Sequence, residues 1–154
     1  MRTKSTLFII LALIVVSALA LRDYLLTTNL DGLSVLSLGF ADLNLQYTVN
    51  TGINFGVAGE GTQSRQLLLA SLAFVICGIV IWWAIKASQR RTSIIAGLFA
   101  GGGIANAIER IAFGGVFDYL NVPLFFYDNP YSFNVADIYI FLGAILYVFG
   151  SSRQ

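Results

Sequence analysis

The sequence predicts a mainly α-helical membrane protein with four transmembrane helices and a small external β-sheet. Of its 154 residues, 57% are hydrophobic and only 11% are charged, which is more apolar surface than a soluble domain of this length can bury. Apolar stretches long enough to form membrane helices recur along the chain. Between two of them lies a segment in which apolar and polar residues alternate, as they do in a strand.

The first span is expected over residues 6–22. Arg2 and Lys4 precede it, and Ala18-Leu19-Ala20 near its end resembles the small-residue cleavage site of a signal peptide. Two interpretations therefore compete, a signal peptide that is removed and a first membrane helix that is retained. We favour the retained helix because further spans follow it.

Three more spans are expected over residues 67–85, 94–108 and 135–150. Trp82 and Trp83 mark the end of the second span, since tryptophan rings favour the membrane interface. Gly97 and Gly101 form a GxxxG pattern in the third span, which is typical of closely packed helices. No internal repeat or low-complexity tail is present, so residues 1–154 are expected to form a single integral membrane domain.

The segments that follow the first and third spans are too long to be simple connections. Residues 43–49 alternate between apolar and polar side chains, which predicts a strand of a small external sheet. Residues 109–134 are rich in aromatic side chains, which predicts a loop lying in the membrane interface. Asp118 falls within this predicted loop.

The basic residues predict the orientation in the membrane. Four spans put both termini and the segment from Lys86 to Ser93 on one side, together with six of the nine basic residues. The positive-inside rule then places both termini in the cytoplasm. All eight acidic residues fall on the external side, so any carboxylate chemistry must face outward.

The composition leaves carboxylates as the plausible catalytic groups. The chain has no histidine, which excludes Ser-His and Cys-His nucleophile pairs and histidine zinc sites. The single cysteine, Cys77, lies in an apolar stretch and is expected to be a small packing residue. A net charge of +1 gives no electrostatic reason to expect a nucleic-acid partner. Neither a metal nor a cofactor is expected.

Two carboxylates stand out on the external side. Asp137 opens the last apolar segment, three residues after Asn134, and Asp118 lies upstream. Two carboxyl groups brought together at a membrane surface favour an aspartyl hydrolase, in which the pair shares one proton. A structural interpretation stays open, because Asn is a good helix N-cap and an acid near a helix N-terminus suits the helix dipole. Likewise, Asn106 and Arg110 share one face at the end of the third span and could be an ordinary polar helix exit.

In combination these residues resemble the lipoprotein signal peptidase family (signal peptidase II), of which the chain looks like a divergent member. Three blocks match in order and the four-span pattern agrees, so the resemblance covers nearly the whole chain. The blocks are Asn50-Thr51-Gly52 with Phe55, then Gly102 to Arg110 with Asn106, and finally Asp118 followed by Phe133-Asn134-Val135-Ala136-Asp137.

The resemblance implies a membrane aspartyl endopeptidase that cleaves signal peptides from diacylglyceryl-modified prolipoproteins at the outer face of the bacterial cytoplasmic (inner) membrane. It implies a fold in which four membrane helices carry an external β-cradle and an interfacial loop or helix. The expected partners are the lipid-modified substrate and membrane lipids, and the protein is expected to be a monomer. The implied catalytic residues are Asp118 and Asp137, and the implied supporting or substrate-binding residues are Asn50, Gly52, Asn106, Arg110, Asn134, Ala136 and Asp23.

A pair of aspartates that shares one proton predicts the following mechanism. The ionised carboxylate takes a proton from water, which attacks the scissile carbonyl. The protonated carboxyl polarises that carbonyl and assists the leaving amine. We assign Asp137 as the ionised member because the N-terminus of a helix favours an anion.

Two departures from the family pattern leave a second interpretation open. Glu109-Arg110 stands where the family has Asp-Arg, and Thr27 stands where it has a lysine, although Asp23 can represent the acid of the same motif. The alternative is a catalytically divergent paralogue that acts as a membrane scaffold or assembly factor. The retained pair of aspartates favours the enzyme, and the missing lysine favours the scaffold. A channel or transporter is disfavoured because no charged residue lies well inside a span.

Overall fold

The structure, a computed structural model, describes residues 2–52, 63–124, 126–127 and 129–150. Phe55 of the first matching block and the acidic residues Glu60 and Asp128 lie outside the described residues. The helices are α1 (Arg2–Thr28), α2 (Gln63–Ala87), α3 (Arg90–Phe113) and α4 (Val135–Gly150). The strands β1 (Ser34–Ser37), β2 (Asp42–Asn50), β3 (Val116–Asn121) and β4 (Ser132–Phe133) form one antiparallel sheet in the order β1-β2-β3-β4.

Within the described part of the chain, α1, α2 and α3 are long and apolar enough to cross a membrane. The protein is therefore a multi-pass membrane protein. Helix α1 has 27 residues and continues past the expected span, from Asp23 to Thr28. Helix α4 is apolar but has only 16 residues, fewer than the roughly 20 that a perpendicular span needs.

Helix α3 is the centre of the helical bundle and packs against each of the other three helices. Small residues along α3 allow this close approach. A Cβ atom at Gly101 would lie 2.8 Å from Cβ of Ile14 in α1, and one at Gly103 would lie 2.6 Å from Sγ of Cys77 in α2. The interpretation of Gly97 and Gly101 as helix-packing residues is confirmed, and Cys77 is a buried packing residue, as expected.

The contact between α3 and α4 brings two backbones together. A Cβ atom at Gly102 would overlap with the carbonyl oxygen of Ala136, in the first turn of α4. A second close contact lies further along α4, at Gly143. A Cβ atom at Gly143 would lie 3.0 Å from the backbone nitrogen of Phe99 in α3. These contacts hold the beginning of α4, and with it Asp137, against α3.

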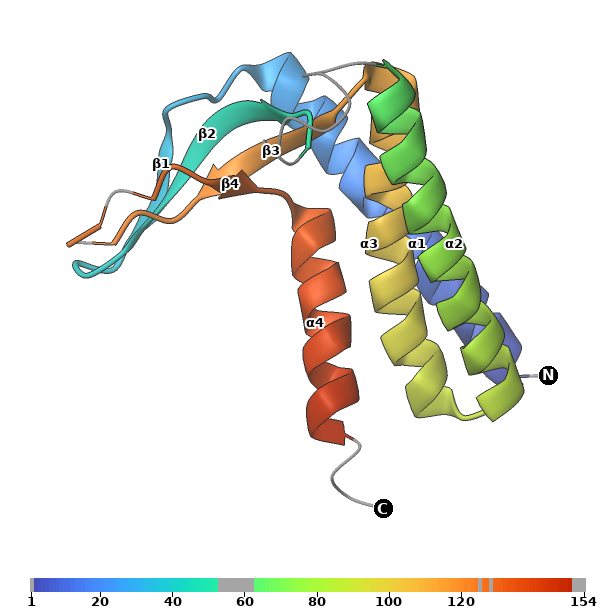
Figure 1. The fold of residues 1–154 in the computed structure, drawn as a ribbon. Helices are drawn as coiled ribbons and strands as arrows, with labels where there is room; N and C mark the ends of the chain where they lie inside the picture. The colour runs from blue at the N-terminus through green and yellow to red at the C-terminus, as the bar shows by residue number, and fades with distance from the viewer. Residues whose placement is uncertain (1, 53–62, 125, 128, 151–154) are drawn as a thin grey trace.

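The sheet lies beside the ends of α1 and α3 and the start of α4, and it extends sideways from the bundle (Figure 1). The strand predicted over residues 43–49 is confirmed as β2. The prediction that Asp118 lies in a loop is wrong, because Asp118 is in the middle of β3, opposite Thr48 of β2. The aromatic residues around it indicated an interfacial loop, but β2 and β4 pair with this segment on both sides and satisfy its backbone. The short strands β1 and β4 were not predicted.

We expect Gly102→Ala to destabilise the protein by about 1–3 kcal/mol, since the added methyl group overlaps with the backbone of α4 and the helices must separate. Gly78→Ala is the matched control, because Gly78 is also helical and a Cβ atom there meets nothing within 4 Å. The control should be neutral or slightly stabilising, since alanine favours helix more than glycine does. Thermal unfolding in detergent compares the two variants, and equal shifts would contradict the close contact at Gly102.

Candidate active site

Asp118 enters the site from β3 and is buried, with 3% of its surface exposed. Both of its carboxyl oxygens accept hydrogen bonds from side-chain amides. Asn134 Nδ2 donates to Oδ1 at 2.9 Å, and Asn50 Nδ2 donates to Oδ2 at 2.9 Å. The first donor comes from the start of α4 and the second from the end of β2, so three elements converge on this carboxyl group.

Asp137 enters from the first turn of α4 and takes part in a capping box. The Asp137 backbone N–H donates to Asn134 Oδ1 at 3.1 Å, and the Asn134 N–H donates to Asp137 Oδ2 at 3.1 Å. Asn106 Nδ2, from α3, donates to the other carboxyl oxygen at 2.8 Å. The capping interpretation is therefore right, and it does not compete with a functional one, since the capping residue Asn134 also donates to Asp118.

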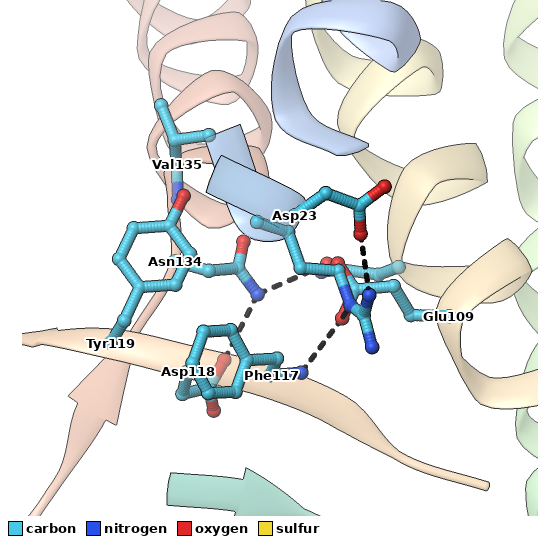
Figure 2. A network of polar contacts seen from close by, with 9 residues as sticks. Asp23, Glu109, Phe117, Asp118, Tyr119, Asn134 and Val135 are labelled. Carbon is cyan, nitrogen blue, oxygen red and sulfur yellow. Dashed lines mark hydrogen bonds and ion pairs between the residues drawn. The ribbon is translucent and has the colours of Figure 1, made fainter. Parts of the chain in front are cut away.

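Asn134 bonds to both carboxyl groups, to Asp118 through its side-chain amide and to Asp137 Oδ2 through its backbone N–H. Its amide nitrogen donates to Asp118 Oδ1 and also to Asn106 Oδ1, the second bond at 3.1 Å, while its amide oxygen caps α4. Figure 2 shows Asn134 lying between the start of α4 and Asp118 on β3. Asn134 is 2% exposed, so this pair of aspartates is bridged by a buried amide in which every polar atom is used.

Burial raises the pKa of Asp118 above the ordinary value for an aspartic acid. The charge of Asp137 raises this pKa further. The hydrogen bonds from Asn50 and Asn134 and the guanidinium of Arg110 lower it, but burial prevails. Asp118 therefore keeps its proton to a higher pH than a solvated aspartic acid does.

Of the other predicted site residues, Arg110 and Gly52 also lie around the pair. Arg110 Nη1 donates to Gln66 Oε1 at 2.9 Å, and Gln66 Nε2 donates to the carbonyl oxygen of Thr51 at 2.5 Å. Gly52 has φ +103°, which favours glycine, and its N–H donates to Asn50 Oδ1 at 2.9 Å. This turn fixes the amide of Asn50 so that its NH₂ group points at Asp118.

Asp23 is placed differently from the rest of the predicted set. Its side chain is 68% exposed, and it pairs with Arg22 at 2.7 Å. In the described structure Asp23 is connected to the site only indirectly. It pairs with Arg22, and Arg22 Nε lies 3.5 Å from Glu109 Oε2. Thr27 does not replace the family lysine here, since its hydroxyl donates to the carbonyl of Tyr24 in its own helix.

Sequence reasoning missed the buried network around Glu109. Glu109 Oε2 accepts the backbone N–H of Phe117 at 2.8 Å, at the start of β3 (Figure 2). The guanidinium of Arg22 lies 3.6 Å from the centre of the Phe113 ring. These contacts tie α1 and α3 to the residue before Asp118. The available signal was a charged residue directly after the predicted end of the third span at residue 108, but nothing in the sequence indicated its partner.

Tyr119 and Gln66 were also missed. The hydroxyl of Tyr119 accepts the N–H of Val135 at 3.2 Å, so it satisfies a donor at the beginning of α4. Burial raises the pKa of Tyr119 to about 12, and the phenol stays neutral at physiological pH. Among the residues that the structure describes, no three His, Cys, Asp or Glu side chains are grouped so that they could hold a metal ion.

We expect Glu109→Ala to destabilise the protein by about 3–5 kcal/mol, because it leaves Arg22 without its buried partner and Phe117 N–H without an acceptor. Glu109→Gln should cost less, about 1–3 kcal/mol, since its amide oxygen can still accept the N–H of Phe117. A double-mutant cycle with Arg22→Met, measured by thermal unfolding, tests the pairing. Strictly additive effects of Arg22→Met and Glu109→Gln would show that the two side chains do not interact.

Comparisons with known proteins indicate the family of the chain. A family model described as signal peptidase (SPase) II matches residues 9–153. A protein of Rhodopseudomonas palustris (strain TIE-1) named lipoprotein signal peptidase is 38% identical over 119 residues, which cover 73% of this chain and 69% of that one. A protein of the same name from Aeromonas hydrophila is 34% identical over 115 residues, covering 72% of this chain and 67% of that one.

Two solved structures share the fold. One, a bacterial membrane enzyme determined by the in meso method at 1.9 Å resolution, has a TM-score of 0.78 at 20% identity and covers 97% of this chain and 94% of that one. The other, determined by the same method at 2.3 Å, has a TM-score of 0.73 at 21% identity, with 97% and 88% covered. The family model matches nearly the whole sequence, and the two relatives named lipoprotein signal peptidase are 38% and 34% identical, so the chain belongs to the signal peptidase II family.

Proposed function

We propose that Asp118 and Asp137 are the catalytic pair with which this signal peptidase II cleaves the signal peptides of diacylglyceryl-modified prolipoproteins. The observation that carries the proposal is the Asn134 amide, which bonds to Asp118 Oδ1 and caps the helix turn that presents Asp137. Family membership supplies the substrate class, since relatives from several bacteria are named lipoprotein signal peptidases.

The environments of the two carboxyl groups suit different roles. Asp118 is buried in the sheet and has a raised pKa, so it is the protonated member that hydrogen-bonds to the scissile carbonyl oxygen. Asp137 accepts N–H donors at the N-terminus of α4, where the helix dipole favours the anion, so it is the member that takes a proton from water. Because the groups are coupled, the proton belongs to the pair.

The reaction then needs four proton transfers, two in each of its two steps, and no metal. As water attacks the carbonyl carbon, its proton moves to Asp137 and the proton of Asp118 moves to the carbonyl oxygen. When the carbon–nitrogen bond breaks, Asp137 gives its proton to the leaving nitrogen and Asp118 recovers its own. Asn50, Asn106 and Asn134 hold the carboxyl groups in position, and Arg110 is the candidate for orienting the substrate backbone.

The alternative, a scaffold that has lost its chemistry, is not favoured. A scaffold would need the Asn134–Asp137 cap for stability. It would have no use for Asp118, whose carboxyl group is buried near a second one at a cost in solvation free energy. The missing family lysine at Thr27 favoured the scaffold. Arg22, which pairs with Glu109, supplies a buried cation in the last two turns of α1, so the absence of that lysine counts for less.

We further propose that α4 is a fourth span and that the single domain works as a monomer among membrane lipids. Helix α4 packs along α3, and its 16 residues extend about 24 Å, which local thinning of the bilayer can accommodate. Four spans place both termini on the side that carries six of the nine basic residues. By the positive-inside rule that side is the cytoplasm of a bacterial cell, and the active site faces outward.

Cysteine labelling in intact cells tests this orientation. Cys77 is 2% exposed, so the natural chain should give little background. We expect Ser34→Cys, in β1, to react with a membrane-impermeant maleimide from outside. Gln89→Cys, between α2 and α3, should react only after the membrane is permeabilised. Labelling of both from the same side would contradict four spans.

We expect Asp118→Asn and Asp137→Asn each to reduce cleavage of a lipid-modified precursor by at least about 100-fold, since neither amide can transfer the required proton. Both proteins should still insert and fold, with about 1 kcal/mol lost at the helix cap in Asp137→Asn. Asp42→Asn is the control, because Asp42 is a carboxylate of the same sheet that bonds to Ser37. Cleavage by either variant at the wild-type rate would reject the catalytic pair.

Asn50→Ala should change the pH profile. The hydrogen bond from Asn50 favours ionised Asp118, so its loss raises the pKa of Asp118 still further. Because the mechanism needs Asp118 protonated, the alkaline fall of kcat/KM should move to higher pH. Gln46→Ala, an exposed change in the same strand, should leave the profile in place. A shift of the alkaline limb to lower pH would contradict the role of Asp118.

A further inference from the structure

A second candidate site lies at the end of the bundle opposite the sheet. The first two turns of α3 and the last turns of α4 line an open cavity of about 360 Å³ there. Two of its lining residues, Arg90 and Arg91, are cationic, and the others, Ile94, Ile95 and Leu146, are apolar. The catalytic mechanism uses none of these residues.

The position of one arginine is fixed by α4. Arg91 Nη2 donates to the backbone carbonyl oxygen of Leu146 at 3.4 Å, so the guanidinium spans the mouth between the two helices. Arg90 is exposed beside it. The site carries positive charge with no acid of its own, because the described acidic residues all lie toward the other helix ends or in the sheet. They are Asp23, Asp31, Asp42, Glu109, Asp118 and Asp137.

An apolar groove adjoins this cationic cavity. It has a volume of about 360 Å³, shares Ile95 with the cavity and includes Phe99 of α3 and Tyr147 of α4. No charged residue lines it. Trp83 of α2 contacts Tyr147 edge to face, with 5.5 Å between ring centres, which places the interfacial tryptophan level close to the arginines.

We propose that this cavity and groove form a binding site for one anionic phospholipid, with its phosphate at Arg90 and Arg91 and an acyl chain along the groove. Guanidinium groups form strong charge-assisted hydrogen bonds with phosphate oxygens. Basic pockets between membrane helices on the cytoplasmic side are suited to anionic headgroups. From Arg91 to Phe99 the helix rises about 12 Å, so the groove lies at the depth of the acyl chains when the arginines lie at the headgroups.

The test compares phosphatidylglycerol with phosphatidylcholine of the same acyl chains, each added to the full-length protein in detergent. At ten times the dissociation constant, a site that binds only the folded protein should raise the melting temperature by about 3–6 °C. We expect this shift with phosphatidylglycerol and a much smaller one with phosphatidylcholine. Inorganic phosphate alone should give none, since it cannot occupy the groove.

Three variants locate the site. Arg90→Gln removes one cation but leaves the Arg91–Leu146 bond, and Ala144→Leu fills the groove; both should abolish most of the phosphatidylglycerol shift. Lys4→Gln removes the same charge from α1, which lines neither cavity, and should keep the shift. Equal shifts from the two lipids, or equal losses in Arg90→Gln and Lys4→Gln, would overturn the proposal. The test is independent of catalysis, because it measures no cleavage.

Discussion

The side-chain amide of Asn134 ties the beginning of α4 to β3, and the geometry of both carboxyl groups depends on it. Its oxygen accepts the N–H of Asp137, so its nitrogen is forced to face Asp118 and Asn106. The amide cannot turn over without breaking the helix cap. A residue that begins a helix therefore also sets the distance and direction between two acids from different elements, which is the preorganisation that proton transfer requires.

The Asn134 amide keeps its position because the elements around it are closely packed. Gly102 lets the backbone of α4 touch α3, and Glu109 accepts the N–H of Phe117, the residue before Asp118. Both supports come from α3, the helix that contacts all the others. The buried pair of Glu109 and Arg22 costs solvation energy, and it is maintained where three elements must meet at one end of the bundle.

Charge is divided between the two ends of the helices. In the described chain, the end that carries the sheet holds the carboxylates, the site asparagines and the Arg22–Glu109 pair. The other end holds Lys86, Arg90 and Arg91. The membrane explains this division, because charged groups are costly inside the bilayer and collect at its two surfaces. Peptide cleavage and recognition of an anionic lipid can then occupy opposite surfaces of one small bundle without competing for residues.

The sequence by itself determined the membrane helices α1, α2 and α3, the strand β2 and the cap at the start of α4, since hydropathy, period-two alternation and the Asn134–Asp137 spacing are local patterns. It did not indicate that Asp118 lies on a strand, because β3 is recognised only when β2 and β4 pair with it. Nor did it indicate that Asp23 would pair with Arg22 away from the carboxyl pair, or that Arg22, Gln66 and Tyr119 would be buried partners of the site. A buried polar group must find a partner, but which distant residue meets it is decided by the packing of the helices and the register of the sheet.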